Sequence, residues 1–309
     1  MNKKGVNSPS FKDKTGEKHI TNEGYEIQII EYLGTYKCNI QFKDGTILNN
    51  LSYHNILNGS VRKPKLGNIY ITREGYEITI VEYKDRFNCT VEFKNGYRLE
   101  DTSLQNVKNG LIKNPYHPTI YNIGYLGNGK YKSSIFGENT YLYKTWRSMF
   151  SRCYDKKIHE RQPNYKDVTV CEEWHNFQNF AKWMENKYNP ETMQSWHLDK
   201  DILIKGNKIY SPETCCFVPK IINSLLILGK RNRGDCPIGL TKKGNRNEVR
   251  VSNIFRKEYK GTYDSIEEAF NIYKIEKEKY IKEVAEGWKD KIDSKVYQAL
   301  INYQVEITD

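Results

Sequence analysis

His197-Leu198-Asp199-Lys200-Asp201-Ile202, in the middle of the chain, is the most informative stretch for predicting the fold. It is interpreted together with the residues that follow it as far as Ser224. It predicts a short strand with paired carboxylates, a polar loop, a second strand at Cys216-Phe217-Val218, and a helix that returns the amide of Asn223. Two strands and a helix that converge on one carboxylate–amide cluster can hold a divalent metal against a phosphate. The same residues could instead form a surface hairpin whose charges are solvated.

Two aromatic helices are expected before this stretch. Apolar residues fall on one helical face around Trp146 and Phe150, and on a second face around Trp174 and Phe177. Such stripes are typical of core positions, so we assign them no chemistry. We expect the helices and the following strands to form one domain over residues 141–229.

The charge of the chain indicates an anionic partner. Its 309 residues are too many for one ordinary domain, and 49 Lys and Arg against 38 Asp and Glu give a net charge of +11. Between residues 230 and 260, ten basic residues stand beside three acidic ones, a local density that favours a surface for nucleic-acid phosphates. We expect double-stranded DNA to lie against these basic residues: Lys230, Arg231, Arg233, Lys242, Lys243, Arg246, Arg250 and Lys257.

The sequence predicts a cytoplasmic protein that binds no membrane. We find no segment long enough to span a bilayer, and the N-terminus lacks the apolar core of a secretory signal. The seven cysteines are an odd number without framework spacing, which fits reduced thiols. Their spacings match no common zinc pattern.

The first third of the chain contains an internal repeat. Gly24-Tyr-Glu-Ile-Gln-Ile-Ile-Glu-Tyr32 returns as Gly75-Tyr-Glu-Ile-Thr-Ile-Val-Glu-Tyr83, and such identity at a fixed offset indicates duplicated modules. Alternating apolar residues predict strands in each copy, and Asp44-Gly45 and Asn95-Gly96 predict tight hairpin turns. We expect a tail at 1–18 and small β modules at 19–65 and 66–115. They could be structural or could bind a protein partner.

The last third predicts a small α+β domain. After a linker or irregular lead-in at 116–140 and the domain described above, residues 237–283 alternate as three strands and then enter a helix at Ser265-Ile-Glu-Glu268, a capping box. Residues 284–309 predict one more helix and a tail. The chain is therefore expected to be a multidomain α+β protein.

Two parts of the sequence resemble known families. Tyr143 to Asn223 resembles phage-type HNH endonucleases, through Trp146-x-x-Met149-x-x-Arg152-Cys153, Leu198-Asp-Lys-Asp-Ile-Leu203 and Ser211-Pro-Glu-Thr-Cys-Cys-Phe-Val-Pro219. Pro237 to Tyr280 is similar to the Apetala-type DNA-binding domain that phage homing endonucleases often carry, through Val249-Arg-Val251 and Gly261-Thr-Tyr-Asp-Ser-Ile-Glu-Glu-Ala269.

The resemblance implies a phage-encoded DNA endonuclease with a ββα-metal fold and one Mg²⁺ or Mn²⁺ ion. The ion polarises the scissile phosphate, and a neighbouring side chain, usually histidine, takes a proton from the attacking water. On this resemblance, Asp199, Asp201 and Asn223 are the expected metal ligands. Asn207 could brace the loop between the strands.

The chain departs from the family at the catalytic base. One register puts Lys200 in the position of the base and keeps Asp199 on the metal; shifting by one makes Asp199 the base and leaves Leu198 where a ligand should be. We prefer the first register. A lysine base would need a strongly lowered pKa, which two neighbouring carboxylates oppose. His197 lies on the same strand face as Asp199 and could replace the missing base.

The same sequence is compatible with two other functions. A catalytically degenerate DNA-binding regulator, or an inhibitor of a host nuclease system, could use the same scaffold. An RNA- or protein-binding adaptor rests on the duplicated β modules alone.

Overall fold

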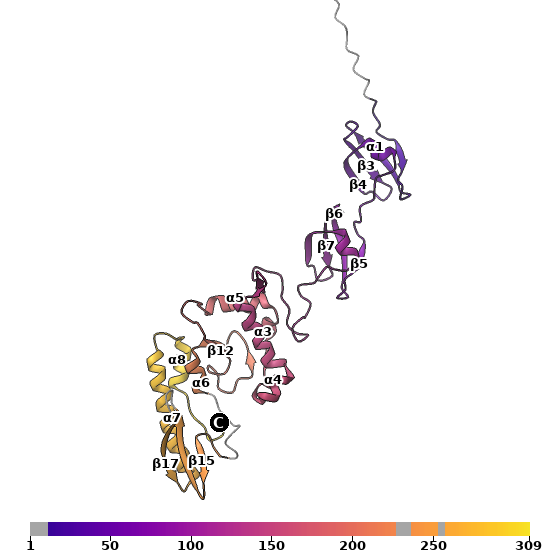
Figure 1. Ribbon diagram of the computed structural model, residues 1–309. Coiled ribbons are helices and arrows are strands. Elements are labelled where there is room, and N and C mark those ends of the chain that lie inside the picture. The colour runs from indigo at the N-terminus through magenta and orange to yellow at the C-terminus, as the bar shows by residue number, and fades with distance from the viewer. Residues whose placement is uncertain (1–11, 227–235, 253–256) are drawn as a thin grey trace, which may run out of the picture. The chain divides into compact units, whose positions relative to one another are not determined.

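The computed structural model describes residues 12–226, 236–252 and 257–309, and the chain divides into two compact units, Met1–Asn114 and Pro115–Asp309. The described residues contain several small sheets and eight α-helices (Figure 1). The predicted α+β class is therefore confirmed. Within the described ranges, no helix is both long and apolar enough to cross a membrane.

In the first unit, both copies of the repeat form the same four-stranded antiparallel sheet followed by a short helix. Each sheet has its strands in chain order and its own buried core. The first contains β1 (Lys18–Ile20), β2 (Glu26–Tyr32), β3 (Cys38–Phe42), β4 (Ile47–Leu51) and α1 (Tyr53–Leu57). The second contains β5 (Ile69–Ile71), β6 (Glu77–Asp85), β7 (Asn88–Phe93), β8 (Arg98–Thr102) and α2 (Leu104–Lys108).

The repeat is also visible in side-chain contacts. Gly45 and Gly96 have φ values of 89° and 82° in equivalent hairpin turns, a conformation that glycine adopts without the clash of a Cβ. A glutamate in the turn between the first two strands of each copy fixes the segment after the helix: Glu23 accepts a hydrogen bond from the backbone N–H of Lys63 (3.4 Å), and Glu74 accepts one from that of Asn114 (3.0 Å). The duplicated polar residues thus serve the fold of each module.

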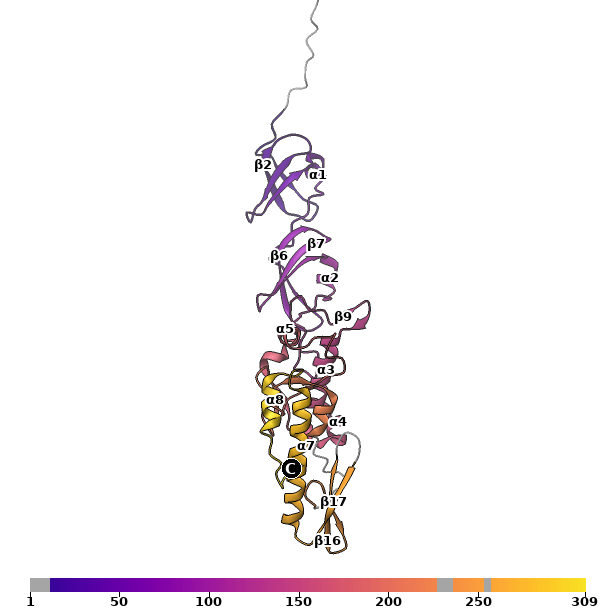
Figure 2. The same cartoon turned by 90° about the vertical axis from the view of Figure 1, so that its left-hand side faces the viewer.

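In the second unit, the lead-in at 116–140 is irregular but packed. Gln178 fixes it by accepting a hydrogen bond from Tyr131 N–H (3.0 Å) and donating to the carbonyls of Leu126 (3.1 Å) and Tyr131 (3.0 Å). Of the two alternatives expected for residues 116–140, a linker or an irregular lead-in, these contacts fit the lead-in. They end in a hairpin of β9 (Ser134–Ile135) and β10 (Glu138–Asn139), which projects beside α3 in Figure 2.

The aromatic helices follow and build the core. Trp146, Phe150, Trp174 and Phe177 are fully buried, as their helical spacing predicts. The Trp146 Nε1–H donates to the carbonyl of Trp174 at 2.7 Å, which satisfies the indole inside the core. The elements are α3 (Tyr141–Tyr154), α4 (Lys156–Arg161), a 3₁₀ turn (Pro163–Tyr165), β11 (Thr169–Val170), a second 3₁₀ turn (Glu172–His175) and α5 (Phe177–Lys187).

The central stretch forms two strands and a helix. β12 (His197–Asp199) pairs antiparallel with β14 (Cys216–Val218), and α6 (Lys220–Leu225) begins two residues after β14 ends. Between these strands, β13 (Ile209–Tyr210) pairs in parallel with β11 instead. The connection between β12 and β14 is therefore held against the aromatic helices.

The last part of the chain is a three-stranded antiparallel sheet with a long helix along it. The sheet has the order β15 (Leu240–Lys243), β16 (Arg246–Ser252) and β17 (Lys257–Tyr263), and α7 (Ile266–Trp288) packs against it. Ser265 caps α7 by accepting a hydrogen bond from Glu268 N–H at 3.2 Å, as the capping box predicts. At Gly239 (φ +80°), an added Cβ would lie 2.0 Å from the ring of Tyr273, so the turn before β15 requires glycine.

Helix α7 continues past residue 283, the end predicted for the small α+β domain, to Trp288 and is followed by α8 (Ser294–Ile301). Ile281, Val284 and Ala285 are buried and extend the apolar face of α7 beyond the small sheet. The Trp288 ring then lies edge-on to Trp196, with centroids 6.3 Å apart. The C-terminal helices therefore share one core with the central stretch.

Candidate functional site

The site begins with the register of β12 on β14. Leu198 is opposite Phe217 and both side chains are buried, while Asp199 is opposite Cys216. Because successive side chains of a strand point to opposite faces, His197 and Asp199 share the face away from Leu198. The core contacts of Leu198 thus fix which way the two polar residues point.

Helix α6 brings Asn223 to His197. The Asn223 Nδ2 donates a hydrogen bond to His197 Nδ1 at 3.1 Å, across 26 residues of sequence. His197 is exposed and Asn223 is half-buried. In this arrangement the neutral ring carries its proton on Nε2; with the amide turned over, Oδ1 would accept from Nδ1–H and leave Nε2 free to take a proton. The amide therefore controls which ring nitrogen is basic.

Among the candidate residues, Asp199 is the carboxylate whose pKa is shifted by its surroundings. Its Oδ1 accepts hydrogen bonds from the backbone N–H groups of Asp201 and Ile202, each at 2.9 Å. Burial, and secondly the charge of Asp201, nevertheless raise the pKa of Asp199 from 3.8 to about 6. Desolvation thus outweighs two favourable hydrogen bonds, and the ionised form of Asp199 is disfavoured.

Lys200 is engaged by its neighbour. Its Nζ donates to Asp201 Oδ2 at 2.9 Å, and the lysine side chain is 9% exposed while that of Asp201 is 45% exposed. Asn207 donates to the carbonyls of Lys200 and Ile209, each at 2.7 Å, and so braces this loop as expected. Lys200 is thus one half of an ion pair with Asp201, an arrangement that fits a structural role better than the role of the base.

A cation–aromatic cluster beside the loop was missed by the sequence reasoning. The Arg152 guanidinium lies 5.1 Å from the ring centroid of Tyr210 and 5.9 Å from that of Tyr165, and Lys200 Nζ lies 6.0 Å from Tyr165. Arg152 Nε is buried and has no hydrogen-bond partner among the described residues. The motif around Arg152 and Cys153 carried the only signal for this cluster.

The candidate residues thus fall into two groups, each held together by its own hydrogen bonds. His197 pairs with Asn223, and Asp199, Lys200 and Asp201 share one turn. Within the part of the chain that the structure describes, no three His, Cys, Asp or Glu side chains form a group that could hold a metal ion by themselves. The predicted ligand set differs from such a group because one of its members is an amide.

Of the eight predicted DNA-binding residues, Lys230, Arg231 and Arg233 lie outside the described residues, and Lys257 opens β17. Lys242 and Lys243 are exposed on β15.

The two arginines of β16 are held by acidic neighbours. Arg246 donates to Asp264 (2.8 Å) and to the carbonyl of Thr262 (2.9 Å), and Arg250 pairs with Glu248. These contacts reduce the charge that Arg246 and Arg250 can offer to phosphate.

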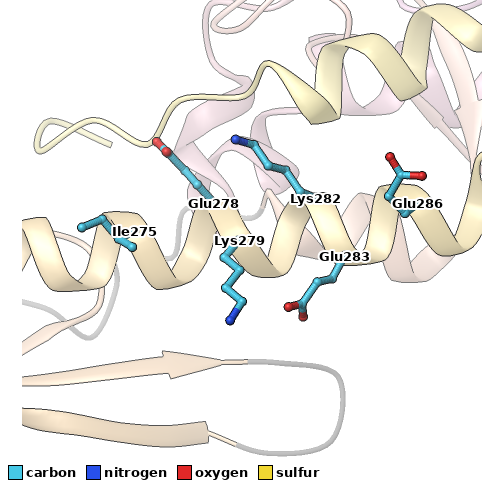
Figure 3. A pocket seen from close by; sticks show the side chains of 6 residues that line it. All are labelled: Ile275, Glu278, Lys279, Lys282, Glu283 and Glu286. Atoms are coloured by element: carbon cyan, nitrogen blue, oxygen red, sulfur yellow. The ribbon is translucent and has the colours of Figure 1, made fainter.

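A shallow depression of about 750 Å³ lies along one side of α7 and contains none of the predicted residues. Figure 3 shows its lining side chains spaced along that single helix, with acidic and basic groups interleaved. This is the pattern of a solvated helix face with i,i+4 pairs. We assign it no site.

Comparison with known proteins adds no relative: a scan against models of protein families, a search of curated proteins and a search of solved structures each found no match.

Proposed function

We propose that the second unit is a divalent-metal-dependent DNA endonuclease with a ββα-type site. The observation that carries the proposal is the order β12–β14–α6, in which the helix returns Asn223 to His197 on the strand that also bears Asp199. Two strands and a helix can hold a base, a carboxylate and an amide close enough to act on one phosphodiester.

The chemistry of the donor set fits a hard divalent cation. Asp199 and Asp201 are carboxylates in one turn, and their proximity together with burial makes the ionised form of Asp199 costly. A cation would offset both effects, and Mg²⁺ and Mn²⁺ prefer carboxylate and amide oxygens. Asp199, Asp201 and Asn223 would hold the ion. When bound, it would polarise the scissile phosphate and stabilise the leaving oxygen.

The remaining steps belong to the side chains. His197 is the base in this proposal, because its ring is exposed and Asn223 orients it. An amide oxygen has two lone pairs, so Asn223 Oδ1 could face the ion and also accept from His197 Nδ1–H; Nε2 can then accept the proton of the attacking water. Lys200 acts through Asp201, whose position it fixes, and does not transfer a proton.

The test is nicking of supercoiled plasmid by the full chain with Mg²⁺, with Mn²⁺ and with EDTA. His197→Ala should lower the rate about 10²- to 10⁴-fold, the range for removal of a general base. Asp199→Ala and Asn223→Ala should also lower it at least 10²-fold.

The first unit offers a matched control. Asn58 Nδ2 contacts His54 Nε2 at 2.9 Å, so His54→Ala breaks the same kind of amide–imidazole pair in the unit that does not contain β12. It should leave nicking unchanged. Full metal-dependent activity in His197→Ala and Asp199→Ala would refute the proposal.

A second candidate is a DNA-binding regulator without cleavage. The observation that favours this candidate is that Asp201 holds Lys200 at the position where HNH endonucleases, which this part of the sequence resembles, have their base. Salt-sensitive binding of duplex DNA by the full chain, with no nicking in either metal, would support this candidate over the endonuclease.

A further inference from the structure

The hairpin β9–β10 presents a phenylalanine to solvent at its tip. Phe136 is 103% exposed, and its neighbour Ile135 is 54% exposed. Because Glu138 pairs with Ile135 across the hairpin, Phe136 and Gly137 form a two-residue turn. A single exposed apolar residue needs no explanation, but two adjacent ones at a projecting tip form a small apolar point.

The backbone of this turn argues against a structural role for the ring. Phe136 has φ 50° and Gly137 has φ 84°, the pair of positive values that defines a type I′ hairpin turn. The first position of that turn favours asparagine, aspartate or glycine, and a bulky residue there is an outlier. The ring therefore neither favours the turn nor contributes to a core.

The hairpin is nevertheless held firmly at its base. Thr140 N–H donates to the carbonyl of Ser133 (2.9 Å), and Thr140 Oγ1 donates to that of Lys132 (3.0 Å). Thr140 also caps α3 by accepting from Tyr143 N–H at 3.2 Å. The tip is thus fixed to the start of a packed helix.

The surroundings of the tip are basic. Residues 128–148 contain four Lys or Arg and one Glu; one of the four, Lys130, is paired with Glu185 at 3.0 Å, which leaves three cations. Lys132 is exposed at the base of the hairpin, and Lys144 and Arg147 are exposed on α3. At 1.5 Å per residue, these last two lie about 6 and 10 Å along the helix from Thr140. An exposed apolar side chain with cations near it is complementary to duplex DNA, in which stacked apolar bases lie between two phosphate backbones.

We propose that Phe136 is a wedge that enters the minor groove of duplex DNA and separates two stacked base pairs, while Lys132, Lys144 and Arg147 contact the flanking phosphates. A two-stranded ribbon with strands about 4.8 Å apart brings one side chain into a groove about 6 Å wide. Apolar wedges of this type unstack a step and bend the duplex. The inference rests on the proposed function, for which it supplies a way to distort the strand to be cut.

The experiment measures binding of the full chain, in EDTA, to a duplex that carries 2-aminopurine, together with plasmid nicking in Mg²⁺. Phe136→Asn removes the ring and installs a residue suited to the left-handed turn. It should weaken binding about 5- to 100-fold, as loss of one stacking contact does, and abolish the fluorescence rise that unstacking gives. Its melting temperature should be unchanged or higher. Phe136→Tyr should restore both signals.

Phe87→Ala is the matched control, because Phe87 is 67% exposed in the first unit; it should bind and unstack as the wild type does. If Phe136→Asn binds and unstacks DNA as the wild type does while the wild type nicks plasmid, the wedge proposal is wrong and the endonuclease proposal stands. The tip of the hairpin would then serve another partner, such as a protein. If Phe136→Asn loses binding although the wild type shows no nicking, the wedge stands without the endonuclease. A wild type that neither binds nor nicks overturns both.

Discussion

Replacing Asp199 by asparagine should make the metal-free protein more stable. The amide keeps an Oδ1 that can accept both hydrogen bonds now made by the backbone N–H groups of Asp201 and Ile202. It removes the negative charge that burial and Asp201 disfavour. Asp199→Asn therefore deletes an unfavourable charge and leaves the geometry of the turn intact.

The magnitude follows from the pKa. A pKa of about 6 in the folded chain against 3.8 for the free side chain means that ionised Asp199 costs about 3 kcal/mol at pH 7.5, at 1.36 kcal/mol per pKa unit. Because the folded pKa is raised, this cost is complete above pH 6 and vanishes below pH 3.8. At pH 5 it should be about 1.5 kcal/mol. The advantage of Asp199→Asn should therefore shrink as the pH falls.

Urea unfolding in EDTA at pH 7.5 and pH 5 measures the effect. All five tryptophans lie in the second unit, so their fluorescence reports the unfolding of that unit alone. We expect Asp199→Asn to gain about 2–3 kcal/mol at pH 7.5 and about half of that at pH 5. A variant no more stable than the wild type at pH 7.5, or a gain independent of pH, would refute the reasoning.

Asp201→Asn is the matched control. It makes the same chemical change two residues later, at a carboxylate that is 45% exposed and accepts a hydrogen bond from the 9%-exposed Lys200. It should give no comparable gain, because a buried ammonium then loses its charged partner.

Three further outcomes are expected. Lys242→Gln combined with Lys243→Gln should lower the slope of log K against log salt for duplex binding by about two, one per phosphate contact, as measured by fluorescence anisotropy. An Ellman assay of the native chain should titrate no more thiols than Cys171 and Cys236, because the other five are buried, whereas all seven should react in denaturant. Gly239→Ala should destabilise the second unit by about 2 kcal/mol or more in the same urea assay, since its Cβ would meet a buried ring at 2.0 Å and its φ is +80°.

The sequence predicts those features that local patterns determine. Alternation around Val249 and Val251 indicates the strand β16, and the Ser265 capping box marks the start of α7 within a residue. Asp44-Gly45 gives the hairpin turn because only its glycine adopts the required φ without strain. In each case the decisive interactions lie within a few residues along the chain.

The site depends on contacts between distant residues, which such patterns do not contain. Asp199 and Asp201 look equivalent in the sequence, yet one is disfavoured as an anion by burial and the other is half-exposed beside Lys200. The difference arises from core residues that pack against the turn. The hairpin around Phe136 is missed for the opposite reason, because strands of two residues show no alternation.

The two carboxylates of this turn also link stability to metal binding. A cation that binds only the folded chain stabilises it by RT ln(1 + [L]/Kd), about 1.4 kcal/mol at tenfold Kd. If Asp199 and Asp201 hold the ion, Mg²⁺ or Mn²⁺ should raise the unfolding midpoint of the wild type and have less effect on Asp199→Asn, so the difference between the two proteins seen in EDTA should narrow as metal is added. Ionic strength matched with NaCl is the control. If the metal raises the unfolding midpoint of both proteins equally, the ion binds elsewhere. If neither metal raises the midpoint of the wild type, these carboxylates are not metal ligands.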